Sequence, residues 1–252
     1  VIIFYFIYGL TIALIDLLGL AIILGVSFLL KKSSGKKARK VLKAFIIIIL
    51  ILGIVGLSGF SVFLLYVKKE ADPLFVTDKL DKPENSTFLD INNEEYAKLG
   101  AEMREKVTYD ELPQVLIDAI IATEDSRFYQ HNGFDAPRFL KASIGQVAQK
   151  LFHVGGNAGG ASTLTMQVVK NQLTDANATK TQGTAGVIRK FEDIYLAIFK
   201  MEKNYTKEQI IEYYVNNHYL GGNIYGVQEA SQEYFGKTVS ELNLSEAAIL
   251  AG

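Results

Sequence analysis

The chain has 252 residues, which is enough for one domain with a sizeable core and additional segments. It contains no cysteine, which fits an exported domain that does not rely on disulfides. Residues 1–67 hold seven of the 26 Lys and Arg and one of the 27 Asp and Glu, so the remainder has an excess of seven acidic residues. That excess argues against a nucleic acid partner. An anionic substrate would need a local group of basic residues.

Two long apolar segments occupy the N-terminal part. Residues 1–30 and 41–67 each exceed the roughly 20 residues that cross a bilayer as a helix, so we expect two transmembrane helices. The segment between them, 31–40, reads KKSSGKKARK, and basic residues in such a short loop mark the cytoplasmic side. Everything after residue 67 is therefore predicted to be extracytoplasmic. A cleaved signal peptide is disfavoured, because the basic cluster follows the first apolar run.

The remainder is predicted to be mainly α-helical. A polar connector, residues 68–95, comes first, with a short strand near Leu74–Val76, and the region Phe88–Gly100 is ambiguous. Residues 174–186 are rich in Thr, Asn, Ala and Gly and are expected to form a mobile loop. Apolar residues at helical spacing predict helices over Val115–Ala122, Phe139–Phe152, Ile188–Lys203, Lys207–Asn216 and Leu242–Ala251, the last with Ser245 as a candidate N-cap.

The segment Ile121–Asp135, IATEDSRFYQHNGFD, places two carboxylates directly after an apolar helix. Glu124 at such a helix end is partly desolvated, which suits a general base. The ordinary alternative is a charged helix end with no chemical role. A glycine-rich stretch, HVGGNAGGAST, then leads into a helix, and a helix N-terminus of this kind offers free N–H groups to an anion.

Five segments of the predicted extracytoplasmic region, the residues after 67, follow one another in a characteristic order. They are the Glu124 segment, GGASTLTMQVVKN (Gly159–Asn171), RKFED (Arg189–Asp193), KEQIIEYYVNNHYLGGNIYGVQEASQEYFGK (Lys207–Lys237) and LNLSEAAILAG (Leu242–Gly252). Together they closely resemble the motifs of the family 51 glycosyltransferases, the peptidoglycan glycosyltransferases found as monofunctional enzymes and in class A penicillin-binding proteins. The resemblance covers residues 96–252. Because the family domain continues past the fifth motif, we expect its last helices to follow Gly252.

The resemblance implies a lysozyme-like glycosyltransferase domain that polymerises lipid II on the outer face of the membrane. The partners it implies are lipid II, the lipid-linked glycan chain, the membrane and proteins of cell-wall synthesis. It implies an inverting reaction that forms a β-1,4 link and releases undecaprenyl pyrophosphate. The resemblance leaves open whether a divalent cation, Mg²⁺ or Mn²⁺, binds at the pyrophosphate.

The resemblance also implies roles for individual residues. Glu124 matches the catalytic base, and Lys170, Arg189 and Lys190 match the basic groups that hold the pyrophosphate. Asp125 is expected to support the local backbone, and a metal role for His131 is disfavoured because no other histidine lies at ligand spacing. The remaining matches to substrate-contacting positions are Ser162, Thr163, Gln167, Phe128 and Asn216, with Lys141 and Lys180 as weaker phosphate contacts. His131 also matches, and a structural or substrate-orienting hydrogen bond is expected for it.

Two positions depart from the family pattern. Asp193 stands where the family has a glutamate with a catalytic role, and its shorter side chain puts its reach to the pyrophosphate or a metal in doubt. Met166 stands where a glutamine is common, which removes one polar group. These departures motivate one rival interpretation, a non-catalytic cell-wall scaffold. A second rival is a lysozyme-like muralytic enzyme, which would not need a basic cluster for a diphosphate.

Overall fold

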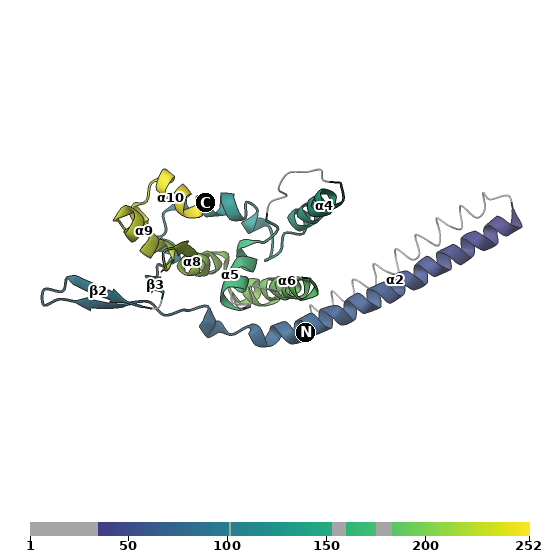
Figure 1. Ribbon diagram of the computed structural model, residues 1–252, viewed down its shortest axis with the longest axis horizontal. Helices are drawn as coiled ribbons and strands as arrows, with labels where there is room; N and C mark the ends of the chain where they lie inside the picture. Colours follow the sequence, from purple (N-terminus) through teal and green to yellow (C-terminus); the bar gives the residue numbers. More distant parts are fainter. Residues whose placement is uncertain (1–34, 101, 153–159, 175–182) are drawn as a thin grey trace. The chain divides into compact units, whose positions relative to one another are not determined.

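The helix α2 (Lys36–Ala71) is 36 residues long and carries many exposed apolar side chains. The structure, a computed structural model, describes residues 35–100, 102–152, 160–174 and 183–252 (Figure 1). Within this part of the chain, one helical stretch, Lys40–Leu74, most of which is α2, has the length and composition of a membrane span, and an 18-residue window in it has a mean hydropathy of 2.8. The second predicted span, 41–67, is therefore part of a longer helix. The first, 1–30, lies outside the described residues.

The chain divides into two compact units, Val1–Tyr66 and Val67–Gly252. At the start of the second unit, two 3₁₀ turns (Asp72–Leu74 and Thr77–Lys79) replace the strand predicted near Leu74–Val76. The prediction was wrong because Pro73 occupies the first turn of a 3₁₀ helix, where its fixed φ and missing N–H are tolerated. The Asp72 carboxylate accepts a hydrogen bond from Tyr195 and pairs with Lys200, which anchors this segment to the domain.

A hairpin formed by β1 (Ser86–Leu89) and β2 (Glu95–Leu99) accounts for the ambiguous region of the sequence. The strands are antiparallel, with Phe88 opposite Ala97. The turn is closed by Asp90, whose carboxylate accepts hydrogen bonds from the backbone N–H groups of Asn92 and Glu94. An aspartate that bonds its own downstream backbone in this way defines the turn and hence the register.

Helices form most of the second unit, as predicted (Figure 1). A small sheet in the order β3-β5-β4 accompanies them, with β3 (Met103–Arg104) parallel to β5 (Ile224–Tyr225) and β4 (Tyr219–Gly221) antiparallel to it. The helices are α3 (Gln114–Glu124), α4 (Ala136–Phe152), α5 (Leu164–Gln172), α6 (Thr184–Leu196), α7 (Glu202–Asn204), α8 (Lys207–Asn217), α9 (Val227–Phe235) and α10 (Leu244–Ala251).

Several predicted boundaries were wrong. The helix α6 begins at Thr184, inside the predicted loop 174–186, of which residues 175–182 lie outside the described part. The predicted helix Ile188–Lys203 is interrupted by a π-helical turn, Ala197–Met201. The helix α10 is capped by Asn243, whose side chain accepts from two backbone N–H groups, and Ser245 lies inside the helix.

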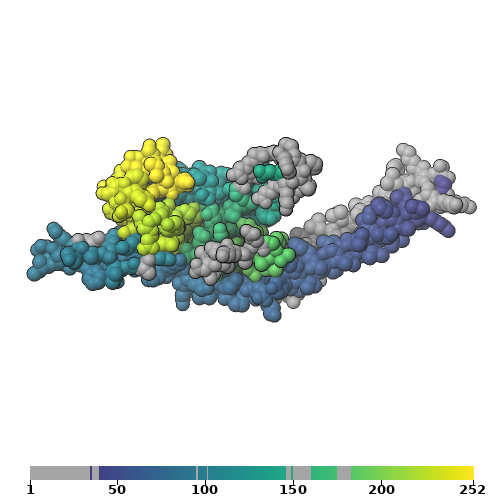
Figure 2. All heavy atoms as spheres, viewed as in Figure 1, coloured from purple at the N-terminus to yellow at the C-terminus, as the bar shows by residue number. Residues whose placement is uncertain are grey.

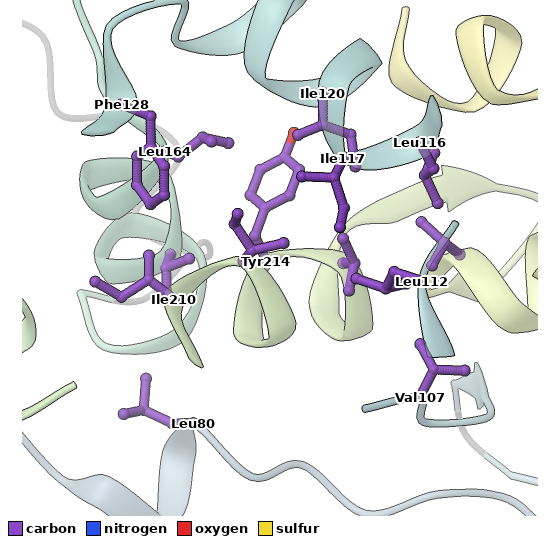
Figure 3. Packing of buried hydrophobic residues seen from close by; sticks show 14 of the residues in the cluster. Leu80, Val107, Leu112, Leu116, Ile117, Ile120, Phe128, Leu164, Ile210 and Tyr214 are labelled. Carbon is purple, nitrogen blue, oxygen red and sulfur yellow. The ribbon is translucent and has the colours of Figure 1, made fainter. Parts of the chain in front are cut away.

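The core lies between α3, α5, α8 and α10. Leu116, Ile117 and Ile120, spaced as one helical face, are buried on α3. Figure 3 shows Tyr214 of α8 pointing toward Ile117 and Ile120. The C-terminal helix α10 packs on α3, and Figure 2 shows these C-terminal residues in yellow against the teal part of the chain. Burial of each such aliphatic side chain contributes about 1.5–3 kcal/mol to the free energy of folding. This packing fixes α3 in the core and with it the position of its last residue, Glu124.

Candidate active site

Glu124 lies where α3 leaves the core. The helix ends there because Asp125 departs from helical geometry, with φ −154° and ψ 71°. The Glu124 side chain is half-buried, and its carboxylate accepts a hydrogen bond of 2.5 Å from the side-chain amide of Gln167. Glu124 and Gln167 line one cavity of about 370 Å³, together with Thr123, Arg138, Gly160, Ser162, Lys170 and Asn171.

Asp125, the residue that follows Glu124, is completely buried. One of its oxygens accepts a hydrogen bond of 3.0 Å from the backbone N–H of Leu164, the first residue of α5. Both oxygens lie 3.1 Å from Nε2 of His131. Asp125 thus joins the end of α3 to the start of α5, an arrangement that agrees with the supporting role expected for it. His131 orients that carboxylate.

The segment before α5 and α5 itself also contribute to the lining of the cavity. Ser162 and Lys170 line it, and the Lys170 side chain is exposed. Thr163 does not fit its expected role as a substrate contact, because it is fully buried and its hydroxyl caps α5 and donates to the carbonyl of Gly133. Met166 is also buried in the core. Its departure from the family pattern therefore takes no polar group from the cavity wall.

The basic cluster expected from the sequence surrounds Asp193. Lys190 donates a hydrogen bond of 2.6 Å to the hydroxyl of Ser162, on the rim of the cavity. Burial lowers the pKa of Lys190, and the charge of Asp193 opposes that change. Burial raises the pKa of Asp193, and the positive charges of Lys190, Arg189 and Lys170 act in the opposite direction. Three cations therefore act on one buried carboxyl group.

Asp193 itself is only 4% exposed. Its carboxylate accepts a hydrogen bond of 2.8 Å from the hydroxyl of Thr174. The shorter side chain is thus held by Thr174, which lies just after the end of α5, and it does not line the cavity. This geometry gives Asp193 the position of an electrostatic partner for the lysines and does not bring it to the cavity itself.

Four other expected contact residues lie elsewhere. Phe128 is fully buried in the core, beside Leu164 (Figure 3), and Lys207 lies over its ring at 4.2 Å. Asn216, expected to approach substrate, is buried, and its amide exchanges two hydrogen bonds with the backbone of Val107, so its role is structural. Lys141 is exposed on α4 and does not line the cavity. Lys180 lies outside the described residues.

The sequence interpretation missed Arg138 and Asn171, which line the cavity. Arg138 lies between the matched motifs, and only the turn after Asp125 brings it back to Glu124. Its guanidinium donates a hydrogen bond of 2.7 Å to the carbonyl of Glu124. No local pattern in the sequence marks this contact. Asn171, in contrast, follows Lys170 in a matched motif and could have been included.

Among the described residues, one group has metal-ligating atoms close together: Asp125, His131 and Asp135 lie within 4.8 Å of one another. Its carboxylates are already bonded to protein donors. Asp135 pairs with Arg127 and accepts from the backbone N–H of Arg138, and Asp125 accepts from Leu164. We therefore interpret this trio as a structural network that holds the turn after Glu124.

These features define a class of protein: a helical domain with one accessible carboxylate and several cations around one cavity, suited to group transfer from an anionic leaving group. Residues 92–252 match the family model described as Transglycosylase. The chain belongs to this transglycosylase family.

The curated relatives carry the names of penicillin-binding proteins. The chain is 41% identical to penicillin-binding protein 1A/1B of Bacillus subtilis (strain 168), over 71% of this chain and 18% of the relative. It is 40% identical to penicillin-binding protein 1A of Escherichia coli (strain K12), over 62% of this chain and 17% of the relative. It is 38% identical to penicillin-binding protein 1F of Bacillus subtilis (strain 168), over 66% of this chain and 22% of the relative. The matched region thus spans about a fifth of each of these relatives.

Proposed function

We propose that this chain is the peptidoglycan glycosyltransferase part of a membrane-anchored enzyme, and that it polymerises lipid II into β-1,4-linked glycan. The observation that carries the proposal is the meeting of Glu124, Gln167 and Lys170 in one cavity. Family membership and the names of the relatives support the same assignment. Inversion at the anomeric carbon and a lysozyme-like fold belong to the proposal as well.

In the proposed reaction, Glu124 acts as the general base. The 4-hydroxyl of the incoming lipid II loses its proton to the carboxylate while its oxygen attacks the anomeric carbon of the lipid-linked chain. The bond from that carbon to the pyrophosphate oxygen breaks, and the electron pair leaves with undecaprenyl pyrophosphate. Gln167 holds the carboxylate in place during this step.

The cations stabilise the charge that develops on the leaving pyrophosphate. Lys170 lines the cavity, and Lys190 reaches its rim through Ser162. Their positive charges act on the buried carboxyl group of Asp193, against the rise in its pKa that burial causes. Such fixed charges supply much of the rate enhancement in transfer reactions.

The residues around Asp193 do not fit a divalent cation at the pyrophosphate. A site for Mg²⁺ or Mn²⁺ requires several oxygen ligands that are open to the ion. Asp193 is a single buried carboxyl group, it is bonded to Thr174, and three cations act on it. We therefore derive no step of the reaction through a metal.

We also propose an extracytoplasmic location for the domain and two membrane spans, 1–30 and 41–67. The support is the basic segment 31–40 between the apolar runs, together with the apolar helix α2. A substrate with an undecaprenyl chain stays in the membrane, so a tether next to the domain keeps the enzyme at its substrate.

The test is polymerisation of labelled lipid II by the purified full-length protein in detergent or vesicles. We expect a glycan ladder that muramidase digests, because that enzyme cleaves β-1,4 links. Incubation with preformed glycan tests the muralytic rival, which would release fragments. A folded protein that yields neither ladder nor fragments would favour a scaffold and overturn the proposal.

A further inference from the structure

Arg138 is a cation of the cavity that the proposed reaction does not use. It lies in the first turns of α4 and lines the cavity with Glu124, Gln167 and Lys170. The helix α4 approaches Glu124 because the turn between them is held by Asp135, which accepts from the backbone N–H of Arg138. The fold therefore brings this guanidinium to the candidate base.

The donors of Arg138 are only partly used. Within the described part of the chain, its side chain makes one hydrogen bond, to the Glu124 carbonyl. The nearest carboxylate oxygen, Oδ1 of Asp125, is 3.6 Å away, beyond hydrogen-bond distance, and Asp125 already accepts from Leu164. A guanidinium has five N–H donors, so most of them remain for a ligand. The side chain is 30% exposed, on the cavity side.

The cavity favours a phosphate-type anion as that ligand. Arg138 and Lys170 both line it, and Lys190 reaches its rim, whereas Glu124 is the one carboxylate among the lining residues. The planar guanidinium pairs with two phosphate oxygens at once, which a lysine cannot do. The hydrogen bond to the Glu124 carbonyl fixes the direction of this fork relative to the base.

We propose that Arg138 is a substrate-binding residue that takes the diphosphate of a lipid-linked sugar and sets its position relative to Glu124. This proposal rests on the proposed function for the identity of the substrate, but the anion site itself does not. A purely structural role, in which Arg138 only ties α4 to α3, predicts that the variant loses stability and keeps its affinity for phosphate.

The experiment measures binding of inorganic pyrophosphate to the full chain by calorimetry, alongside lipid II polymerisation. Arg138→Gln is expected to weaken pyrophosphate binding roughly 10- to 100-fold, the loss of one to two charge-assisted hydrogen bonds. Arg138→Lys is expected to recover part of that loss. Lys203→Gln, which removes one charge from an exposed residue outside the cavity, serves as the matched control and is expected to bind as the wild type does.

Equal affinity of the wild type and Arg138→Gln for pyrophosphate would overturn the proposal. If Arg138→Gln does not fold, Arg138→Lys decides: unchanged pyrophosphate affinity and unchanged KM for lipid II in that variant would overturn it equally. Failure of the proposed function gives a different result. A wild type that binds pyrophosphate through Arg138 but never polymerises lipid II would keep the anion site and remove the assigned reaction.

Discussion

Gln167 donates a hydrogen bond of 2.5 Å from its side-chain amide to the carboxylate of Glu124. Glu124 is the last residue of α3 and Gln167 lies in the first turn of α5, so this bond joins the two helices at the cavity. Asp125 makes a second connection between the same helices one residue further on. The candidate base is therefore held from two sides, one accessible and one buried.

Replacement of Gln167 tests the accessible contact. Gln167→Met keeps the size of the side chain but removes the donor, and we expect kcat to fall about tenfold, since one charge-assisted hydrogen bond is lost. Gln167→Glu places a second carboxylate against Glu124, and two adjacent carboxylates cannot both ionise readily. We therefore expect a larger loss of kcat in Gln167→Glu than in Gln167→Met, measured with labelled lipid II. An unchanged kcat in both variants would contradict the contact.

Replacement of Asp125 tests the buried contact. Asp125→Asn removes a buried charge that accepts from Leu164 and lies beside His131, and we expect a loss of about 2 kcal/mol in the free energy of unfolding. Denaturant unfolding measures it. Asp118→Asn, at an exposed position of the same helix, is the control and is expected to change stability by less than about 0.5 kcal/mol. Equal losses of unfolding free energy in both variants would contradict the stabilising role assigned to Asp125.

Gly133 in the turn after Glu124 is predicted to tolerate no side chain. Its φ is +80°, and an added Cβ would lie 2.9 Å from the carbonyl group of Ala197. Gly236 has a similar φ of +67° but no atom within 4 Å of such a Cβ. Gly133→Ala is therefore expected to lower the free energy of unfolding by about 2–4 kcal/mol, and Gly236→Ala by about 1 kcal/mol. Thermal unfolding compares them, and similar losses would contradict the crowding at Gly133.

Asp193 is predicted to lower the stability of the folded domain at neutral pH and to support the polymerisation rate. Because burial raises its pKa in the folded state, the ionised carboxyl group costs folding free energy, and this cost appears as the pH rises through the unfolded-state pKa of about 3.9. Asp193→Asn should therefore be more stable than the wild type at pH 7, with a smaller difference near pH 3, while its polymerisation rate falls. Urea unfolding at the two pH values measures this. A variant that is less stable at pH 7 would contradict it.

The sequence motifs indicated which segments form the cavity, but they did not indicate which side chains in those segments face it. Glu124, Gln167 and Lys170 line one cavity, because α3 ends at Glu124 and residues 167 and 170 are three apart on the same face of α5. Phe128 and Asn216 were misassigned, since a motif match does not distinguish a residue that packs beneath the site from one that faces it.

Other features depended on contacts between distant segments. Arg138 reaches Glu124 only through the turn held by Asp135, which no periodicity indicates. The hairpin Ser86–Leu99 has no clear alternation of apolar residues, and its register depends on the side-chain contacts of Asp90 in the turn. The helical content, in contrast, followed directly from the apolar spacing of α3 and α8.

Lipid II polymerisation by Glu124→Gln tests the central claim most directly. Glutamine keeps the shape of the side chain and removes its capacity to take a proton, so we expect kcat to fall by about 100-fold or more. The control is Glu233→Gln, at an exposed position of α9, which is expected to polymerise at the wild-type rate. Circular dichroism and pyrophosphate binding establish that the variant is folded with its anion site intact. A folded Glu124→Gln protein that polymerises lipid II at the wild-type rate would contradict the role assigned to Glu124.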